Sequence, residues 1–346
     1  MLNKLLGRFS KDIGIDLGTS NTRIYTRDKG IFINEPSIVT VNVRSSQIVA
    51  VGREAQKMIG KTPPHIITIH PLVDGVISDF EVTEKMLKFF INRVHQDSFS
   101  LLPRPRVVIG IPLDITEVER KAVEDANVSA GAREVILVNN VIAAAIGARI
   151  PIKEPSAQMI VNFGGGRTEV AVLSLAGVVT WKSLKTAGEE FNNDIVQFVR
   201  NEFNVLLGER ASEEAKMKIG SAWELPNPLE MKIRGRDLIS GLPREITVND
   251  YQIREALARS IRVIIDNIKA VLEVTPPELV ADIYEKGMIL CGGGALLKGI
   301  DQAINKAVQI PVQVVDDPLT CVVRGTGLII EKLEDYKELV IPSAQG

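Results

Sequence analysis

The sequence contains few of the residues that build metal centres and disulfide frameworks. Among 346 residues there are two cysteines, Cys291 and Cys321, which form no C-x-x-C motif, and three histidines, His65, His70 and His95. These counts exclude a disulfide-stapled miniprotein and give no pattern of metal ligands. Two reduced thiols are typical of a cytoplasmic protein.

An excess of charge of either sign is also absent, as are long apolar runs. The 41 basic and 43 acidic side chains leave a net charge of −2, so no overall field attracts a polyanion and nucleic acid is not an expected partner. The most apolar stretch, residues 135–148, is interrupted by Asn139 and Asn140 and is too short to span a bilayer. With 45% hydrophobic residues, the chain still has enough apolar material for two domains.

The first twelve residues, MLNKLLGRFSKD, have the pattern of a short basic amphipathic helix. They lack the long apolar region and the cleavage site of a signal peptide. Their cations alternate with the apolar residues Met1, Leu2, Leu5, Leu6 and Phe9. Such a helix can lie in a bilayer interface with its cations near anionic headgroups. The sequence alone leaves a second interpretation open, a leader that packs on its own domain.

Apolar runs that end at glycine alternate with helical patterns along the chain. The apolar runs cover residues 13–18, 107–112, 159–166 and 288–294. The helical patterns cover residues 82–96, 116–132, 191–203 and 249–274. This alternation predicts an α/β architecture.

An internal duplication relates two of these runs. Residues 16–22 and 162–168 share the spacing Asp/Asn-apolar-Gly-x-x-x-Thr. Each is predicted to be a β-hairpin whose glycine turn lets backbone N–H groups approach an anion. Two such turns that face each other would hold a polyphosphate from two sides, although ordinary tight hairpins remain the alternative. Residues 291–297, CGGGALL, add a third glycine-rich turn after a strand.

Taken in order, the segments DLGTSN, NFGGGRTE, GERASEEAK and CGGGALL resemble the motifs of the actin-like ATPase superfamily. Longer strings resemble one branch of it, the MreB family of bacterial cell-shape proteins. These strings are INEPSIV (33–39), DGVISDFEVTEKML (74–87), AGAREVILV (130–138), PPELVADIYEKGMIL (276–290) and DPLTCVVRGTG (317–327). The resemblance extends from residue 1 to about residue 332 without large gaps.

This resemblance implies an α/β, actin-like fold of the duplicated RNase H-like class, with two domains in four subdomains around a nucleotide cleft. An amphipathic membrane-binding helix would occupy 1–12. The subdomains would be 13–34, 62–147 and 312–346 (IA), 35–61 (IB), 148–182 and 243–311 (IIA), and 183–242 (IIB).

The resemblance also implies a site for ATP or ADP with Mg²⁺. The first phosphate loop would comprise Asp16, Gly18, Thr19, Ser20 and Asn21, with Asp16 holding Mg²⁺ through water. The second would comprise Gly164, Gly165, Gly166 and Arg167, together with Gly188. Glu213 and Lys216 would reach the ribose and adenine, a pair that the sequence alone would assign to a solvated helix face. The adenosine would lie against Gly292, Gly293, Gly294, Ala295 and Leu296.

Several positions depart from the family pattern. Asn139 and Asn140 replace two consecutive glutamates, Asn162 replaces the aspartate of the second phosphate loop, and Arg167 replaces the threonine after GGG. The motif GGDxFD reads AGEEFN at residues 187–192. A general base is worth about 10²- to 10⁴-fold in rate, so we expect nucleotide binding with weak or lost hydrolysis. Arg167 adds a cation that can contact phosphate and lower the dependence on Mg²⁺. Retained activity, through Asp16 and a water held by the Asn140 amide, is the alternative.

The family also implies partners. Members bind the inner membrane through an N-terminal helix or an apolar loop, and Phe99, Leu101 and Leu102 fall where that loop is expected. We therefore expect a peripheral protein on the cytoplasmic face of the cell membrane, assembled head to tail into paired filaments, that works with cell-wall elongation and shape-determining proteins. A soluble scaffold of the same family is an alternative. A small-molecule kinase is less favoured because no acceptor-site base or sugar-recognition insert is recognisable. A chaperone-like switch is disfavoured because we expect no peptide-binding domain after the last matching segment.

Overall fold

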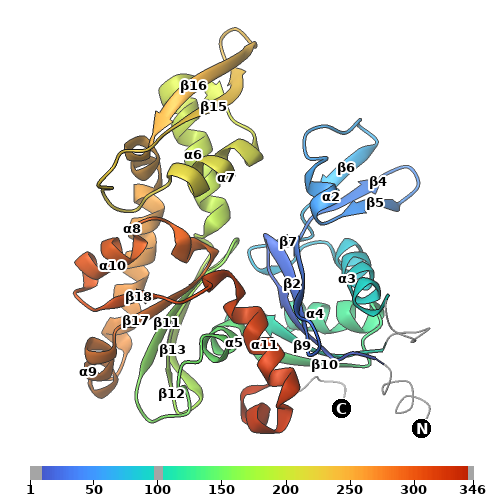
Figure 1. Ribbon diagram of the computed structural model, residues 1–346, viewed down its shortest axis with the longest axis vertical. Helices are drawn as coiled ribbons and strands as arrows, with labels where there is room; N and C mark the ends of the chain where they lie inside the picture. The colour runs from blue at the N-terminus through green and yellow to red at the C-terminus, as the bar shows by residue number, and fades with distance from the viewer. Residues whose placement is uncertain (1–9, 97–103, 342–346) are drawn as a thin grey trace. The chain divides into compact units, whose positions relative to one another are not determined.

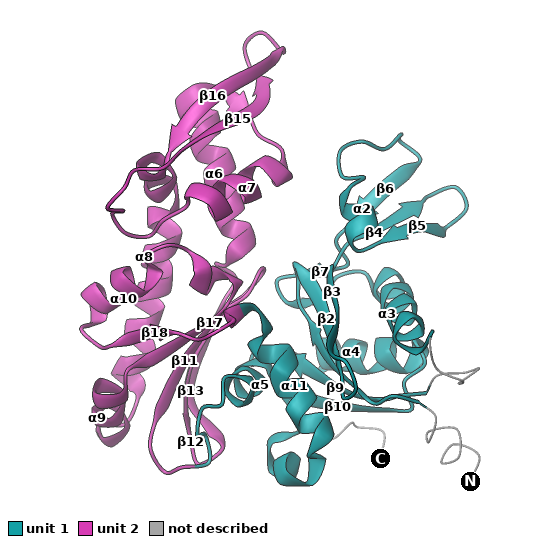
Figure 2. Cartoon of the chain, in the orientation of Figure 1, with its two compact units in different colours: residues 1–153, 319–346 teal, residues 154–318 magenta. Residues whose placement is uncertain are grey.

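The computed structural model describes residues 10–96 and 104–341. The expected membrane-contacting residues Met1, Leu2, Leu5, Leu6, Phe9, Phe99, Leu101 and Leu102 lie outside the described residues. The chain divides into two compact units (Figure 2). Unit 1 comprises residues 1–153 and 319–346, and unit 2 comprises residues 154–318. Within the described part, no helix combines the length and apolarity needed to cross a bilayer.

Unit 1 is built on a five-stranded sheet with the strand order β10-β9-β1-β2-β3 (Figure 1). The strands are β1 (Ile13–Leu17), β2 (Asn21–Thr26), β3 (Gly30–Pro36), β9 (Arg106–Ile111) and β10 (Glu134–Asn139). Strands β1, β9 and β10 run parallel, whereas β2 pairs antiparallel with β1 and β3. The carboxyl ends of the three parallel strands therefore lie at one edge of the sheet.

Two helices with capped N-termini belong to the core of unit 1. They are α3 (Phe80–His95), which begins after Asp79, and α4 (Glu117–Ser129), which begins after Thr116. The Asp79 carboxylate accepts the Val82 N–H at 3.0 Å, and Thr116 forms a capping box with Glu119. The core cluster joins the fully buried β1 residues Ile13 and Ile15 to Phe90 and Ile91 of α3.

Helices α5 (Asn140–Gly147) and α11 (Cys321–Glu331) pack against each other at backbone distance. A Cβ atom on Gly147 would lie 1.9 Å from the Cys321 carbonyl oxygen, and one on Gly325 would lie 1.8 Å from that of Ala143. Both positions therefore require glycine. This packing fixes α5, and with it the Asn140 residue that begins the helix. The short helix η4 (Leu333–Leu339) follows α11.

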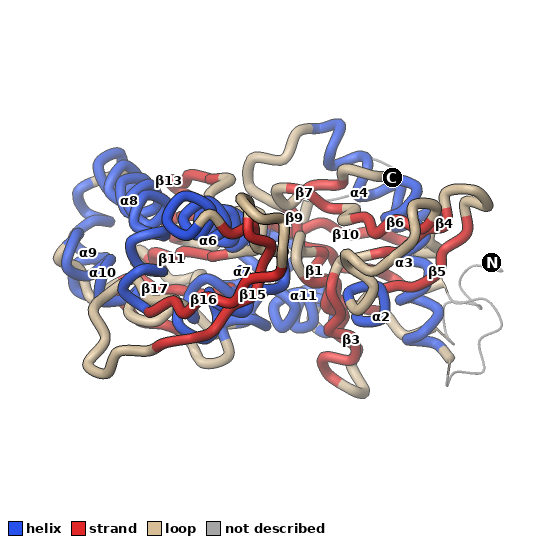
Figure 3. The backbone as a smooth tube through the Cα atoms, turned by 90° about the horizontal axis from the view of Figure 1, so that it is seen from above, coloured by secondary structure: helices blue, strands red, loops and turns tan. Residues whose placement is uncertain are grey.

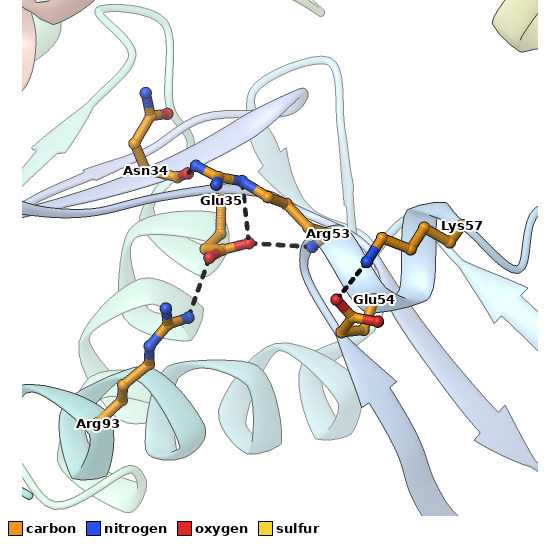
Figure 4. A network of polar contacts seen from close by, with 6 residues as sticks. All are labelled: Asn34, Glu35, Arg53, Glu54, Lys57 and Arg93. Carbon is orange, nitrogen blue, oxygen red and sulfur yellow. Dashed lines mark hydrogen bonds and ion pairs between the residues drawn. The ribbon is translucent and has the colours of Figure 1, made fainter.

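A smaller sheet in unit 1 has the order β5-β4-β6. Its strands are β4 (Val39–Asn42), β5 (Gln47–Val51) and β6 (Ile66–Ile69), accompanied by α2 (Arg53–Gln56) and the strand pair β7 (Leu72–Val73) and β8 (Val76–Ile77). A polar network ties α2 to β3 and α3 (Figure 4). The buried Glu35 carboxylate accepts the Arg53 backbone N–H at 3.0 Å and Arg93 Nη1 at 2.9 Å. Helix α2, which follows the small sheet's strand β5, is therefore connected to the large sheet of its own unit by a hydrogen bond to a carboxylate.

Unit 2 repeats the strand arrangement of unit 1. Its five-stranded sheet has the order β13-β12-β11-β17-β18, formed by β11 (Gln158–Phe163), β12 (Thr168–Ser174), β13 (Gly177–Leu184), β17 (Met288–Gly292) and β18 (Val312–Val314). Strand β11 pairs antiparallel with β12 and parallel with β17, as β1 does with β2 and β9. The next pairs outward also match, because β12–β13 is antiparallel and β17–β18 is parallel. The duplication in the sequence is thus a duplication of the sheet.

The division into two units differs from the expected domain boundaries at two places. Residues 312–318, expected in the first domain, belong to unit 2 because β18 pairs with β17 at the edge of the second sheet. Residues 148–153, expected in the second domain, belong to unit 1. The finer division into four subdomains stays a prediction.

Several helices accompany the sheets of unit 2 (Figure 3). They are α6 (Gly188–Phe203), α7 (Glu209–Ile219), α8 (Asp250–Val274), α9 (Pro277–Lys286) and α10 (Ile300–Val308), with the 3₁₀-helices η2 (Gly293–Leu296) and, at the boundary with unit 1, η3 (Pro318–Thr320). Helix α8 packs on β12 and β13, and α6 packs on α8. A small sheet, β14 (Val205–Leu206), β15 (Glu230–Asp237) and β16 (Pro243–Asn249), completes the unit. All four expected helical stretches are present, as α3, α4, α6 and α8.

Candidate phosphate- and nucleoside-binding site

The turn between β1 and β2 is the first predicted phosphate loop. The Gly18 N–H donates to the Asn21 carbonyl oxygen at 3.2 Å, which closes the hairpin. A Cβ atom on Gly18 would lie 2.8 Å from that oxygen, so the turn requires glycine there. The backbone N–H groups of Thr19 and Ser20 donate no hydrogen bond within the described residues, which leaves both for a ligand.

The turn between β11 and β12 has the same geometry. The Gly164 N–H donates to the Arg167 carbonyl oxygen at 2.8 Å, and a Cβ atom on Gly164 would lie 2.7 Å from it. The N–H groups of Gly165 and Gly166 likewise donate no hydrogen bond in the described part of the chain. Each unit therefore carries one glycine-closed turn with two backbone donors at its tip. This confirms the predicted pair of hairpins.

Ser37, which the sequence analysis did not select, supports the first turn together with buried threonines. Ser37 Oγ donates to the Gly18 carbonyl oxygen at 2.6 Å and lies 2.8 Å from Thr22 Oγ1. Thr19 is 3% exposed, and its Oγ1 accepts the Gly75 N–H at 2.9 Å. In the second turn, Thr168 Oγ1 donates to the Thr186 carbonyl oxygen at 2.8 Å. The repeated threonine of the sequence motif is thus a structural residue in both hairpins.

Asp16 precedes the first turn and lies across the hairpin from Arg23. Arg23 Nη1 is 3.2 Å from Asp16 Oδ2. Burial raises the pKa of Asp16, and the charge of Arg23 opposes that shift. No cluster of three or more His, Cys, Asp or Glu side chains able to hold a metal occurs among residues 10–96 and 104–341. Because Arg23 holds one of its oxygens, Asp16 fits a water-mediated contact with Mg²⁺ better than direct coordination.

Asn162 occupies the position in unit 2 that Asp16 has in unit 1. Its Nδ2 donates to Glu169 Oε2 at 3.4 Å across the hairpin, and Cys291 Sγ lies 3.5 Å from its Oδ1. Asn162 is 8% exposed and Glu169 is 1% exposed. The amide therefore separates a buried carboxylate from a buried thiol, and Glu169 is a carboxylate beside this turn that the sequence analysis missed.

Arg167 and Asn140, two other departures from the family pattern, contact neighbouring strands of their own units. Arg167 Nη1 donates to Ser183 Oγ on β13 at 3.1 Å. Asn140 begins α5, whose first turn contains no acidic residue. Its Oδ1 lies 2.3 Å from where a Cβ atom of Gly110 would be, so this side chain covers the carboxyl end of β9. Asn140 and the first turn follow parallel strands that end at the same edge of the sheet in unit 1.

Glu213 and Lys216 meet the start of α6. Lys216 Nζ donates to Glu213 Oε2 at 3.0 Å and to the Gly188 carbonyl oxygen at 2.8 Å. The Gly188 N–H in turn donates to the Gly164 carbonyl oxygen at 3.2 Å. A chain of hydrogen bonds thus links the predicted nucleoside-contacting pair to the second phosphate turn. The sequence alone would assign Glu213 and Lys216 to a solvated helix face, but the Lys216 side chain is only 15% exposed.

The third glycine-rich segment packs on the same turn. Gly292 has φ +81°, and a Cβ atom there would lie 2.2 Å from the Phe163 carbonyl oxygen. One on Gly294 would lie 2.7 Å from Phe163 Cβ. Ala295 is buried and Leu296 is 54% exposed. Three segments far apart in the sequence, residues 162–167, 188–216 and 291–296, therefore form one connected site in unit 2.

The chain is similar to known proteins over almost its whole length. The MreB/Mbl protein family matches residues 10–338. The chain is 46% identical over 326 residues to the cell shape-determining protein Mbl of Bacillus subtilis (strain 168), covering 94% of this chain and 97% of Mbl. It is 46% identical over 338 residues to the cell shape-determining protein MreB of Escherichia coli (strain K12), covering 96% and 97%. The crystal structure of MreB5 of Spiroplasma citri bound to ADP superimposes with a TM-score of 0.90 at 36% identity, covering 95% of this chain and 98% of MreB5, and the form bound to AMPPNP gives the same values.

Proposed function

The chain belongs to the MreB/Mbl family of cell shape-determining proteins, and from this premise we propose that it is an ATP- and ADP-binding filament protein that hydrolyses ATP weakly or not at all. The family membership and the structural match to MreB5 confirm the expected actin-like fold. The observation that carries the proposal is the pair of matched glycine turns with free backbone donors. That MreB5 is bound to ADP or AMPPNP in its crystals supports it.

The turns fit the phosphates of a nucleotide. Backbone N–H groups at a glycine turn approach an anion without a side chain in between and supply fixed partial positive charge. Thr19, Ser20, Gly165 and Gly166 each offer one such N–H group. In unit 2, Glu213 and Lys216 offer an acceptor and a cation for the nucleoside, connected through Gly188 to the second turn. Glycine at 164 and 18 keeps each turn closed.

Mg²⁺ fits this site through Asp16, which would hold its water shell. When bound, Mg²⁺ neutralises phosphate charge and orients the attacking water. The chain's own residues at positions 140 and 162 contribute little to the cleavage of ATP. An amide at position 140 cannot accept a proton from water, and the amide of Asn162 donates to Glu169 instead of presenting a carboxylate. Binding without efficient cleavage is the outcome that these residues favour.

Phosphate release from Mg-ATP tests the proposal. The wild-type rate should be very low, and Asn140→Glu, Asn162→Asp and Arg167→Thr combined should raise it by about 10²-fold, as general-base catalysis does. Calorimetric titration with ADP in the presence of Mg²⁺ is the control, which checks that both proteins still bind nucleotide. A wild-type turnover equal to that of an active family member would contradict the loss of hydrolysis. Absence of ATP and ADP binding would contradict the site itself.

We further propose that the filament lies on the cytoplasmic face of the cell membrane and organises cell-wall synthesis with elongation and shape-determining proteins. The apolar residues Met1, Leu2, Leu5, Leu6 and Phe9, with cations between them, support membrane contact. Liposome flotation with and without residues 1–9 tests it. Flotation unchanged by the deletion would move the contact to Phe99, Leu101 and Leu102, and no flotation of the intact protein would favour a soluble scaffold. Sedimentation with nucleotide tests self-association.

A further inference from the structure

Asn192 in α6 lies against Glu213 of the nucleoside-contacting pair. It is 9% exposed, and its Nδ2 donates to Glu213 Oε2 at 2.5 Å. The same oxygen accepts Lys216 Nζ at 3.0 Å. The other oxygen of the carboxylate, Glu213 Oε1, accepts no hydrogen bond from the described residues, and the side chain is 42% exposed.

The orientation of the Asn192 amide is forced by its neighbour. An ionised carboxylate only accepts hydrogen bonds, so the NH₂ group must face Glu213 and Oδ1 must face away. In that orientation Oδ1 is buried and has no hydrogen-bond partner among residues 10–96 and 104–341. An unpaired buried oxygen is unfavourable, and an apolar side chain would fill this position without it. What an asparagine adds at this position is therefore the hydrogen bond to Glu213.

We infer that Asn192 is a positioning residue that holds Glu213 so that its free oxygen meets a ribose hydroxyl of the bound nucleotide. The inference rests on the proposed nucleotide site. Two donors, Asn192 and Lys216, fix one carboxylate oxygen, and the second is left to accept from the ligand. Carboxylate oxygens are strong acceptors for hydroxyl groups. Asn192 itself does not contact the ligand, because its own unused oxygen is buried.

The inference makes aspartate the worst isosteric replacement, although the family motif GGDxFD carries aspartate at this position. Asn192→Asp would bring a second carboxylate to the Glu213 oxygen, with Lys216 as the nearby cation. Like charges at this distance repel, so Glu213 would turn away from its place. ATP affinity should fall by about tenfold or more, while 2′,3′-dideoxy-ATP, which lacks both ribose hydroxyls, should lose less than about twofold.

The experiment is a calorimetric titration of ATP and of 2′,3′-dideoxy-ATP into four full-length proteins. They are the wild type, Asn192→Asp, Asn192→Ala and the matched control Asn193→Asp. Asn193 is the exposed neighbour on the same helix and contacts Glu190 rather than Glu213. Asn192→Ala removes the hydrogen bond without adding charge. Its loss of ATP affinity should therefore be smaller than that of Asn192→Asp, and its affinity for the dideoxy analogue should stay nearly unchanged. A double variant, Asn192→Asp with Glu213→Gln, exchanges donor and acceptor and should recover most of the ATP affinity.

The outcomes separate this inference from the proposed function. If the wild type binds neither nucleotide, the proposed site is wrong and the inference falls with it. If the wild type binds ATP but Asn192→Asp and Asn192→Ala weaken ATP and the dideoxy analogue equally, or behave like Asn193→Asp, the positioning role alone is wrong. If Asn192→Asp does not fold, Asn192→Ala still tests the positioning role. A loss of affinity for ATP but not for the dideoxy analogue supports the role, and an equal loss for both contradicts it.

Discussion

The substitution Asn162→Asp restores the residue that the family pattern has at the second phosphate loop, yet we expect it to destabilise the free protein. The Asn162 amide donates to the Glu169 carboxylate at 3.4 Å, and the two residues are 8% and 1% exposed. A carboxylate in place of the amide would face another carboxylate without solvent between them. On the other side of the amide, Cys291 Sγ contacts Asn162 Oδ1.

The size of the effect follows from the distance. Two unit charges 3.4 Å apart repel by about 5 kcal/mol at an effective dielectric constant near 20. Protonating one of the two carboxyl groups at neutral pH avoids the repulsion at a cost of about 4 kcal/mol. The free energy of unfolding therefore cannot fall by more than about this amount. Relaxation of the surrounding structure reduces the repulsion further, and we expect the free energy of unfolding to fall by about 3 kcal/mol. This corresponds to a fall of roughly 6–12 °C in the melting temperature of a unit of this size.

Thermal unfolding at pH 8 and pH 5, with Asn162→Ala as the uncharged control, measures the charge effect. The like-charge pair raises a carboxyl pKa in the folded variant above its unfolded value. The folded variant therefore takes up the proton first, and its deficit is full at pH 8 and shrinks as the pH falls toward 5. Mg-ATP should stabilise the Asp variant more than ATP with EDTA does. An Asp variant as stable as the Ala variant at pH 8 would refute the reasoning.

Three further perturbations test other parts of the structure. Gly164→Ala should abolish ATP binding in titration calorimetry while the protein stays folded, because the added Cβ would lie 2.7 Å from the carbonyl oxygen that closes the turn. Glu35→Gln weakens the 2.9 Å contact with Arg93 and should lower the free energy of unfolding by about 1–2 kcal/mol in chemical denaturation, since both arginine partners are largely solvated. Burial and the bond to Glu331 raise the pKa of Tyr25 to about 12. Because unfolded tyrosine ionises near 10, stability should fall as the pH rises from about 10 to 12, and Glu331→Gln should lower the Tyr25 pKa in an ultraviolet titration.

The local parts of the candidate site are readable from the sequence because they depend on neighbours along the chain. The spacing of Gly18 and Gly164 to the end of each turn predicts the two hairpins, and the structure confirms both. The alternation of strands and helices predicts the α/β class for the same reason, since each pattern is set by its own period. The four expected helices begin and end within a few residues of the observed ones.

The roles of single side chains across the sheet and between helices are not readable in this way. The phosphate contact expected of Arg167 stays a prediction, and nothing in the sequence indicates the contact of its guanidinium with Ser183. Asn192 and Glu213 come from different helices, and no spacing relates them. The edge strand β18 follows a crossover of the chain, and its three residues carry no signal that assigns them to the second sheet.

The sequence by itself thus determined the repeated strand–turn–strand units and their glycine donors, because hydrogen bonds between near neighbours create them. Only the tertiary structure decided what surrounds each altered position. A buried Glu169 makes Asn162 the compatible residue, because burial strengthens charge interactions. Glu213 makes Asn192 the useful one, because folding brings their two helices together.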